Sequence, residues 1–145
     1  IELAHDFLPS YVNLADLYRV QGEDLKAEQI LNKVLRIEPD YAEALHSLGL
    51  LLIRGGRPNE ALPSLKRAAE INPNNPRFSY VYGVALHDLG YKELSITTLE
   101  RSAIKHPENR EILSALAAYC AEAGKSKEAE AWTAKLSQLL PVSNR

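Results

Sequence analysis

Apolar residues recur along the chain in short stretches, and their spacing alternates between three and four residues. In one stretch Leu45, Leu48 and Leu52 follow this spacing, and in the next stretch Leu65 and Ala68 do so. Residues spaced in this way lie on one side of an α-helix, because the helix has about 3.6 residues per turn. Glycine and proline separate the stretches throughout the chain. The pattern therefore predicts a series of short amphipathic helices.

The separating residues recur with a fixed period of 34 residues. Prolines stand at Pro39, Pro73, Pro107 and Pro141, and glycines stand at Gly22, Gly56, Gly90 and Gly124. A period of this length is typical of proteins built from stacked structural repeats. We therefore divide the chain into four predicted units, which are residues 8–41, 42–75, 76–109 and 110–143. Residues 1–7 align with the end of a unit, so we interpret them as the tail of a preceding helix or repeat in a longer protein.

Each unit is predicted to contain two antiparallel helices of about 14 residues. The glycine at position 15 of a unit is expected to end the first helix in the left-handed conformation, and the proline at position 32 is expected to end the second helix. Small residues occupy position 8 of the first helix (Ala15, Gly49, Gly83, Ala117) and position 20 of the second (Ala27, Ala61, Ser95, Ala129). These residues predict a close approach of the two helices, where a larger side chain would overpack the core.

The composition is that of a folded domain. Of the 145 residues, 46% are hydrophobic and 25% are charged, which argues against intrinsic disorder. The net charge of −2 makes nucleic acid an unexpected partner, because binding to its phosphates needs clustered positive charge. No apolar run approaches the roughly 18 residues of a membrane span, so we expect no span in this chain.

No group of residues predicts catalysis, a metal site or a cofactor. The four histidines, His5, His46, His87 and His106, are scattered among different units. The single cysteine, Cys120, lies on a predicted packing stripe, where a buried and inert thiol is expected. The glycine pair before Arg57 has no following Lys-Ser or Lys-Thr and no preceding strand, so it predicts a helix-to-helix turn rather than a phosphate loop. We therefore expect a protein that is not an enzyme and that binds no metal or cofactor.

The 34-residue unit resembles the tetratricopeptide repeat (TPR). The second unit matches the family pattern best, at Leu45, Leu48, Gly49, Leu52, Ala61, Leu65, Ala68 and Pro73. The third unit departs from it at Ser79, Ser95 and Ser102, and the fourth departs at Cys120 and Thr133. The resemblance implies an all-α fold, a right-handed α-solenoid of four antiparallel helix pairs, and a protein or peptide as the partner.

In TPR proteins the first helix of each pair lines a concave groove, and the free face of that helix is expected at positions 2, 5, 9 and 12 of each unit. The predicted partner-binding residues are Val12, Asp16, Arg19, His46, Leu50, Ile53, Arg77, Tyr80, Val84, His87, Ser114 and Ala118. Several of them are apolar, which favours a peptide or helix as the occupant. The Lys, Asn and Arg clamp of chaperone-binding TPR domains is missing, since Val12, Asp16, Ser47, Tyr80 and Val84 stand at its positions.

These features predict a non-catalytic scaffold that docks a peptide or helix in its concave groove. The alternative is a regulatory or targeting module of a larger enzyme. A looser resemblance, carried by Tyr11–Arg19 and Tyr80–His87, points to the C-terminal TPR segment of bacterial multihaem cytochromes, although no Cys-x-x-Cys-His occurs here. That reading would place the chain in the periplasm, and the others leave the cytoplasm open. End-to-end self-association is a further possible interaction.

Overall fold

The computed structural model describes residues 5–139, and these form eight α-helices after a short 3₁₀ turn at His5–Phe7. The helices are α1 (Leu8–Val20), α2 (Asp24–Ile37), α3 (Ala42–Arg54), α4 (Pro58–Ile71), α5 (Pro76–Asp88), α6 (Lys92–Lys105), α7 (Arg110–Glu122) and α8 (Ser126–Leu139). Within residues 5–139 there is no β-strand. The prediction of an all-α chain of short helices is therefore confirmed.

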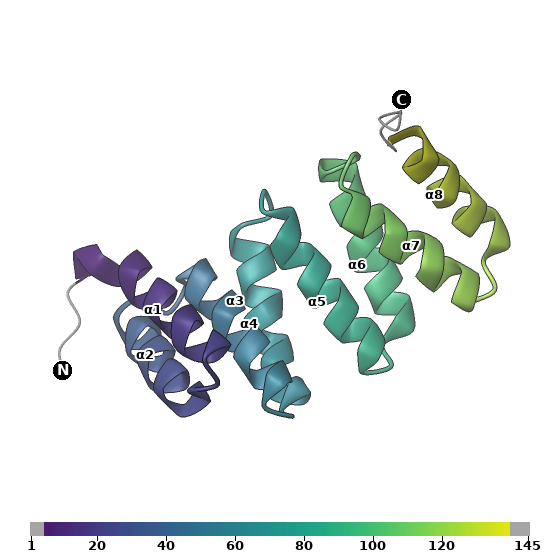
Figure 1. The fold of residues 1–145 in the computed structure, drawn as a ribbon. Helices are drawn as coiled ribbons and strands as arrows, with labels where there is room; N and C mark the ends of the chain where they lie inside the picture. The colour runs from purple at the N-terminus through teal and green to yellow at the C-terminus, as the bar shows by residue number, and fades with distance from the viewer. Residues whose placement is uncertain (1–4, 140–145) are drawn as a thin grey trace. The chain divides into compact units, whose positions relative to one another are not determined.

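The chain divides into two compact units, residues 1–72 and residues 73–145. The first unit holds the pairs α1–α2 and α3–α4, and the second holds α5–α6 and α7–α8 (Figure 1). Within each unit, consecutive helices pack against each other, and the second helix of one pair also packs against the first helix of the next. The exact boundaries of the four 34-residue repeats stay a prediction, while the helices themselves begin at intervals that follow this period.

A left-handed glycine joins the two helices of every pair. Gly22, Gly56, Gly90 and Gly124 have φ values between 77° and 94°, and no other residue type has a positive φ among the described residues. This conformation strains a residue that carries a Cβ atom, so glycine is favoured there. The prediction that these glycines end the first helix of each pair is confirmed. Pro141 lies outside the described residues.

A core cluster of the first unit lies between α1, α2 and α3. Leu8 and Ala15 on α1 pack with Leu31 and Val34 on α2, and Leu51 of α3 joins the same cluster. In the second pair of this unit, α3 approaches α4 at Gly49. A Cβ atom added to Gly49 would lie 2.5 Å from Cγ of Leu65, which is itself fully buried. The absence of a side chain at this position therefore allows the two helices to come together.

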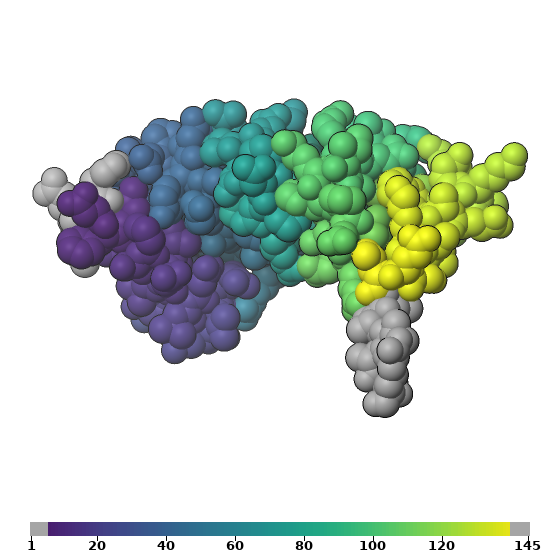
Figure 2. Space-filling model, turned by 90° about the horizontal axis from the view of Figure 1, so that it is seen from above, coloured from purple at the N-terminus to yellow at the C-terminus, as the bar shows by residue number. Residues whose placement is uncertain are grey.

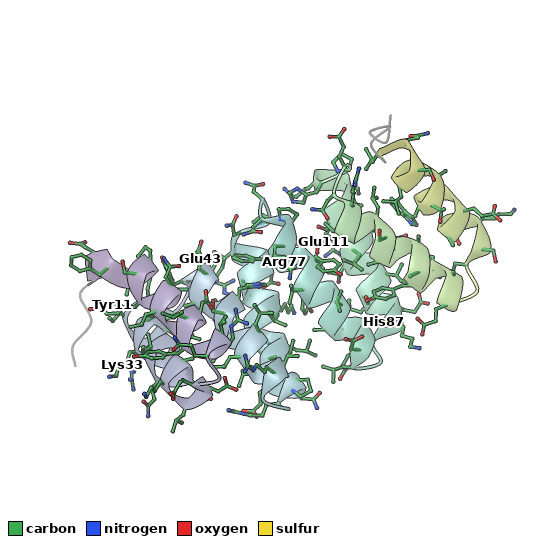
Figure 3. The ribbon with its side chains drawn as sticks, in the orientation of Figure 1. Tyr11, Lys33, Glu43, Arg77, His87 and Glu111 are labelled. Carbon is green, nitrogen blue, oxygen red and sulfur yellow. The ribbon has the colours of Figure 1, made fainter. Side chains whose placement is uncertain are left out.

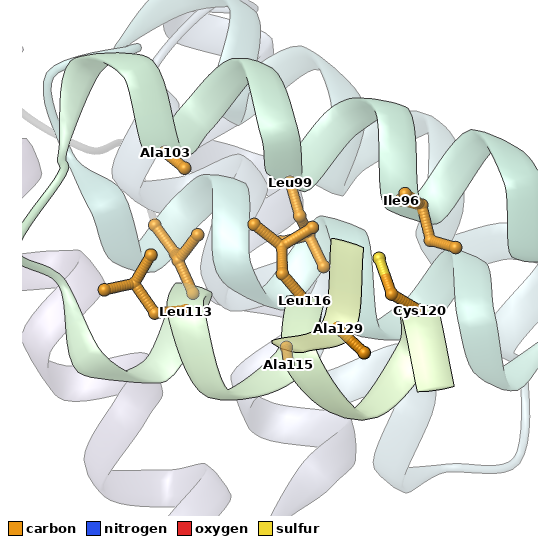
Figure 4. Packing of buried hydrophobic residues seen from close by; sticks show 9 residues of the cluster. Ile96, Leu99, Ala103, Leu113, Ala115, Leu116, Cys120 and Ala129 are labelled. Carbon is orange, nitrogen blue, oxygen red and sulfur yellow. The ribbon is translucent and has the colours of Figure 1, made fainter. Parts of the chain in front are cut away.

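The core of the second unit is built in the same way (Figure 4). Ile96 and Leu99 of α6 pack against Leu113 and Leu116 of α7. Trp132 on α8 is half-buried and packs against this cluster, as the sequence predicted for a core residue. Figure 2 shows α8, in yellow, at the surface of this unit beside the green helices of the same unit.

Ser95 of the third repeat is accommodated by a hydrogen bond and not by a change of fold. Ser95 is fully buried, and its hydroxyl donates a 2.7 Å hydrogen bond to the carbonyl oxygen of Gly83 on the facing helix. A buried hydroxyl costs free energy unless it is paired, and this bond supplies the partner. Gly83 permits the contact, because a Cβ atom there would lie 2.6 Å from a methyl carbon of Leu99.

We predict that Gly49→Ala destabilises the first unit by about 1–3 kcal/mol, because the added methyl group collides with the buried side chain of Leu65. Urea unfolding followed by circular dichroism would measure the loss. Gly55→Ala is the matched control, since Gly55 has a φ of −79° and is exposed. Equal stability of the two variants would contradict this account of the packing.

Candidate interaction surface

In the second unit, one side of α5 carries four of the predicted partner-binding residues. Arg77, Tyr80, Val84 and His87 are separated by three, four and three residues, so they lie along one side of the helix. This side of α5 borders α7, which contacts α5 directly. From Arg77 to His87 the line extends roughly 15 Å, at about 1.5 Å per residue.

An ion pair closes one end of this line. The Arg77 guanidinium lies 2.8 Å from a carboxylate oxygen of Glu111, on α7, and both side chains are labelled in Figure 3. The same guanidinium lies over the ring of Tyr80, with 5.6 Å between its central carbon and the ring centroid. Both charged groups are half-exposed, so solvent weakens their attraction.

A second polar cluster closes the other end. The His87 ring stacks on the Tyr119 ring with 3.7 Å between centroids and an angle of 4° between planes. Its Nε2 atom lies 2.8 Å from Oε2 of Glu122, and the other oxygen of Glu122 accepts a 2.7 Å hydrogen bond from Lys92. Residues of α5, α6 and α7 therefore meet at this end.

The surroundings in this cluster shift the pKa values of Glu122 and Tyr119. Hydrogen bonds from Lys92 and from His87 lower the pKa of Glu122, so its carboxylate stays ionised. Burial is the main cause that raises the pKa of Tyr119 to about 12, with smaller contributions from Asp88 and Tyr80. The phenol of Tyr119 is therefore neutral at physiological pH.

Between the two polar ends lies a mainly apolar stretch. Tyr80 and Val84 of α5 are half-buried, while Ser114 and Ala118 of α7 are exposed and small. We call the six residues Arg77, Tyr80, Val84, His87, Ser114 and Ala118 the α5–α7 surface. It presents aliphatic and aromatic groups between two charged borders, which is the composition of surfaces that bind peptides.

In the first unit, the predicted residues divide into exposed and buried ones. Asp16, Arg19 and Leu50 are half-buried, and Ile53 is 38% exposed. An ion pair joins Asp16 and Arg19, with 3.7 Å between their nearest charged atoms.

Val12 and His46, at position 5 of their units, are buried, and the prediction that they bind a partner is wrong. They are only 5% and 8% exposed, so a partner cannot reach their side chains on the folded surface. The reason is their place on the helix. Val12 lies between Leu8 and Ala15, four residues before and three after it, and these two residues are fully packed in the core. His46 lies in the same way between buried Ala42 and Gly49.

Tyr119, Glu122 and Lys92 were not predicted from the sequence. Tyr119 and Glu122 follow positions that the repeat pattern assigns to the groove by one residue, and Lys92 begins a second helix. The signal that could have found Glu122 is its separation of 35 residues from His87, since residues one period apart lie side by side in neighbouring pairs. Lys92 and Tyr119 carry no comparable signal.

Other candidate chemistry is absent from the part of the chain that the structure describes. Cys120 is fully buried, and burial raises the pKa of its thiol, so it is poorly reactive. Among residues 5–139 no group of three or more His, Cys, Asp or Glu side chains could hold a metal ion. None of the described helices is both long and apolar enough to cross a membrane.

The paired helices, their glycine turns and a bordered surface on the first helices define a protein-binding helical-repeat domain. Family models of the tetratricopeptide repeat match residues 6–74, 52–118 and 111–135. The chain belongs to the tetratricopeptide repeat family, whose members generally mediate protein–protein interactions.

Parts of two curated relatives match the sequence of this chain. The chain is 30% identical to mouse protein O-mannosyl-transferase TMTC3 over 88 residues, and 32% identical to the human protein over 79 residues. These matches cover 60% and 54% of this chain but span only about a tenth of the curated relatives, 10% and 9%.

Among solved structures, a crystal structure of MamA matches with a TM-score of 0.82 at 23% identity, over 94% of this chain and 74% of that chain. MamA from Desulfovibrio magneticus RS-1 matches with a TM-score of 0.81 at 20% identity, over 95% and 78%. These likenesses show the fold alone.

We predict that Glu122→Gln destabilises the second unit at neutral pH and has no effect in acid. The pKa of Glu122 is lowered in the folded state from its usual 4.5, so its contribution to stability is present above 4.5 and is lost as the pH falls through the lower value. Urea unfolding of both proteins at a series of pH values would measure the difference. Glu130→Gln on the exposed side of α8 is the control, and a difference that does not change with pH would contradict the role of this carboxylate.

Proposed function

We propose that the chain is a non-catalytic scaffold that docks a peptide or a helix along the first helices of its repeats. The observation that carries the proposal is the α5–α7 surface. Half-buried Tyr80 and Val84 of α5 and exposed Ser114 and Ala118 of α7 lie between the Arg77–Glu111 ion pair and the Lys92–Glu122 ion pair. An apolar stretch between fixed polar groups favours a ligand with apolar anchors and polar ends.

Leu50 and Ile53 support the same function for the first unit. Both are accessible aliphatic side chains on α3, three residues apart, and they extend the apolar character of the first helices. Asp16 and Arg19 of α1 supply charged groups in the same unit. We infer that this unit also binds a partner through these accessible side chains.

Catalysis, a cofactor and nucleic acid have no support in the described residues. Cys120 is buried, the histidines are separated, and no metal-binding cluster occurs in residues 5–139. The net charge of −2 disfavours a nucleic acid partner. A protein partner is consistent with each of these observations.

A second candidate is that the chain serves a larger enzyme as its binding or targeting module. The curated relatives favour it, because their names describe O-mannosyl-transferases and the matched repeats span about a tenth of their length. In this reading the repeats select a partner or substrate protein for an activity outside this chain. A parent of the multihaem cytochrome type is a variant of this candidate and rests only on the looser sequence resemblance. End-to-end self-association through the open ends of the repeat array is a further proposal.

We predict that Val84→Glu weakens binding of a selected peptide about tenfold or more, which corresponds to about 1.4 kcal/mol, because it places a carboxylate in the centre of the apolar stretch. Peptides would be selected from a display library on the wild-type chain, and their affinity would be measured by isothermal titration calorimetry. Lys127→Glu on the exposed side of α8 is the control, with unchanged helical circular dichroism required of both. If every selected peptide bound Val84→Glu as tightly as the wild type, the proposed site would be wrong.

A further inference from the structure

One side of α1 carries exposed aliphatic residues at helical spacing. Leu14 is 37% exposed, Leu17 is 51% exposed, and Val20 at the end of the helix is 71% exposed. Leu17 is three positions from both Leu14 and Val20 and four positions from exposed Asn13, so these four residues lie along one side of the helix. We call Asn13, Leu14, Leu17 and Val20 the α1 outer face.

The equivalent residues of α3 and α7 are covered by a neighbouring helix. Counted by the 34-residue period, the residues that match Leu14 and Leu17 are Leu48 and Leu51 on α3 and Leu116 and Tyr119 on α7. Leu51 is 3% exposed and Leu116 is fully buried, because α3 packs against the preceding α2 and α7 packs against the preceding α6. Among residues 5–139 no α-helix precedes α1. The side of α1 that a preceding second helix would cover is therefore the exposed one.

Val20 makes this side of the first repeat more apolar than the repeat pattern requires. The residues at its position in the other three repeats are charged, namely Arg54, Asp88 and Glu122. The fold therefore accepts a charge at this position, and the exposed valine extends the apolar surface of Leu14 and Leu17 by a further turn. Neighbouring exposed apolar residues of this kind indicate an interaction surface.

The covering helices α2 and α6 show which chemistry such a side accepts. Leu31 of α2 lies in the same core cluster as Leu51 of α3. Ile96 and Leu99 of α6 lie in the same core cluster as Leu116 of α7. Both covering helices thus meet the following first helix with aliphatic side chains. The α1 outer face has no charged residue, so its occupant needs an aliphatic side and no charged group within it.

We propose that the α1 outer face docks an amphipathic helix of this chemistry, in the place that α2 takes on α3 and that α6 takes on α7. The α8 helix of a second copy matches this chemistry less well. Its residues at the positions of Ile96, Leu99 and Ala103 of α6 are polar, namely Glu130, Thr133 and Ser137. The α1 outer face contains none of the predicted partner-binding residues, so the proposal is independent of the proposed function.

Binding of a synthetic helix to the whole chain tests the proposal. The peptide has the sequence of residues 23–38, which includes α2, and a lactam bridge from Lys33 to residue 29, changed Gln29→Glu, holds it helical. Both bridged positions lie on the opposite side of the helix from Leu31, so the aliphatic side stays free. Isothermal titration calorimetry is expected to show saturable binding of this peptide to the wild-type chain.

Variants of the chain locate the binding site of the peptide. Leu17→Lys with Val20→Lys is expected to weaken binding about tenfold or more, because the aliphatic side of the peptide would then cover two charges. Ile104→Lys is the matched control, since Ile104 is 81% exposed on α6 and outside the α1 outer face. Val20→Arg is a second test variant that copies Arg54 of the second repeat, so the fold accepts it, and it is also expected to weaken binding.

Other outcomes would overturn the proposal. A wild-type chain that does not bind the bridged helix would do so. Equal binding by the wild type and by the folded variants would also do so, because the peptide would then replace α2 or bind elsewhere. Sedimentation equilibrium of the chain alone tests the other occupant. Self-association that Val20→Arg abolishes and Ile104→Lys does not would make a second copy, and not an aliphatic helix of a partner, the occupant of the face.

Discussion

Each helix pair depends on a close approach between its two helices at one small residue. In the pair α3–α4 the small residue is Gly49, which contacts the buried side chain of Leu65, and in α5–α6 it is Gly83, which contacts Leu99. Helices of 13 or 14 residues have little stability in isolation, so the packing between helices supplies stability that the backbone hydrogen bonds alone do not. The left-handed glycine in the turn lets the chain reverse its direction, so that the second helix lies close enough to the first to make this contact.

This constraint explains how a repeat can depart from its pattern without losing its fold. Ser95 replaces alanine at a contact position, and its hydroxyl is paired with the carbonyl oxygen of Gly83 in the same place where the helices touch. Position 8 and position 20 must be small, but one of the two can be polar when the facing backbone offers a hydrogen-bond acceptor. Positions farther from this contact, such as exposed Leu94 and Ile104 of α6, are free to vary.

The first helices connect this packing to binding. One side of each first helix packs against the second helix of its own pair and against the neighbouring pair. Tyr80, Val84 and Leu50 lie on the side that remains accessible. Polar contacts between pairs, such as Arg77 with Glu111 and His87 with Glu122, join residues about one period apart and hold the borders of the α5–α7 surface in place. Side chains that already contact one another in the free protein lose less conformational entropy when a partner binds.

The 34-residue period by itself determined the helices, their glycine turns, the small contact residues and the family. It could do so because glycine, proline and helical spacing act locally, and each repeats four times. Tertiary structure alone decided which residues of the predicted site can be reached. Val12 and His46 share a helix side with core residues and are buried, whereas Tyr119 and Glu122 of α7 and Lys92 of α6 join His87 of α5. The spacing of residues within one helix cannot predict such contacts. They depend on how much of each helix its neighbours cover and on which side chains of different helices touch.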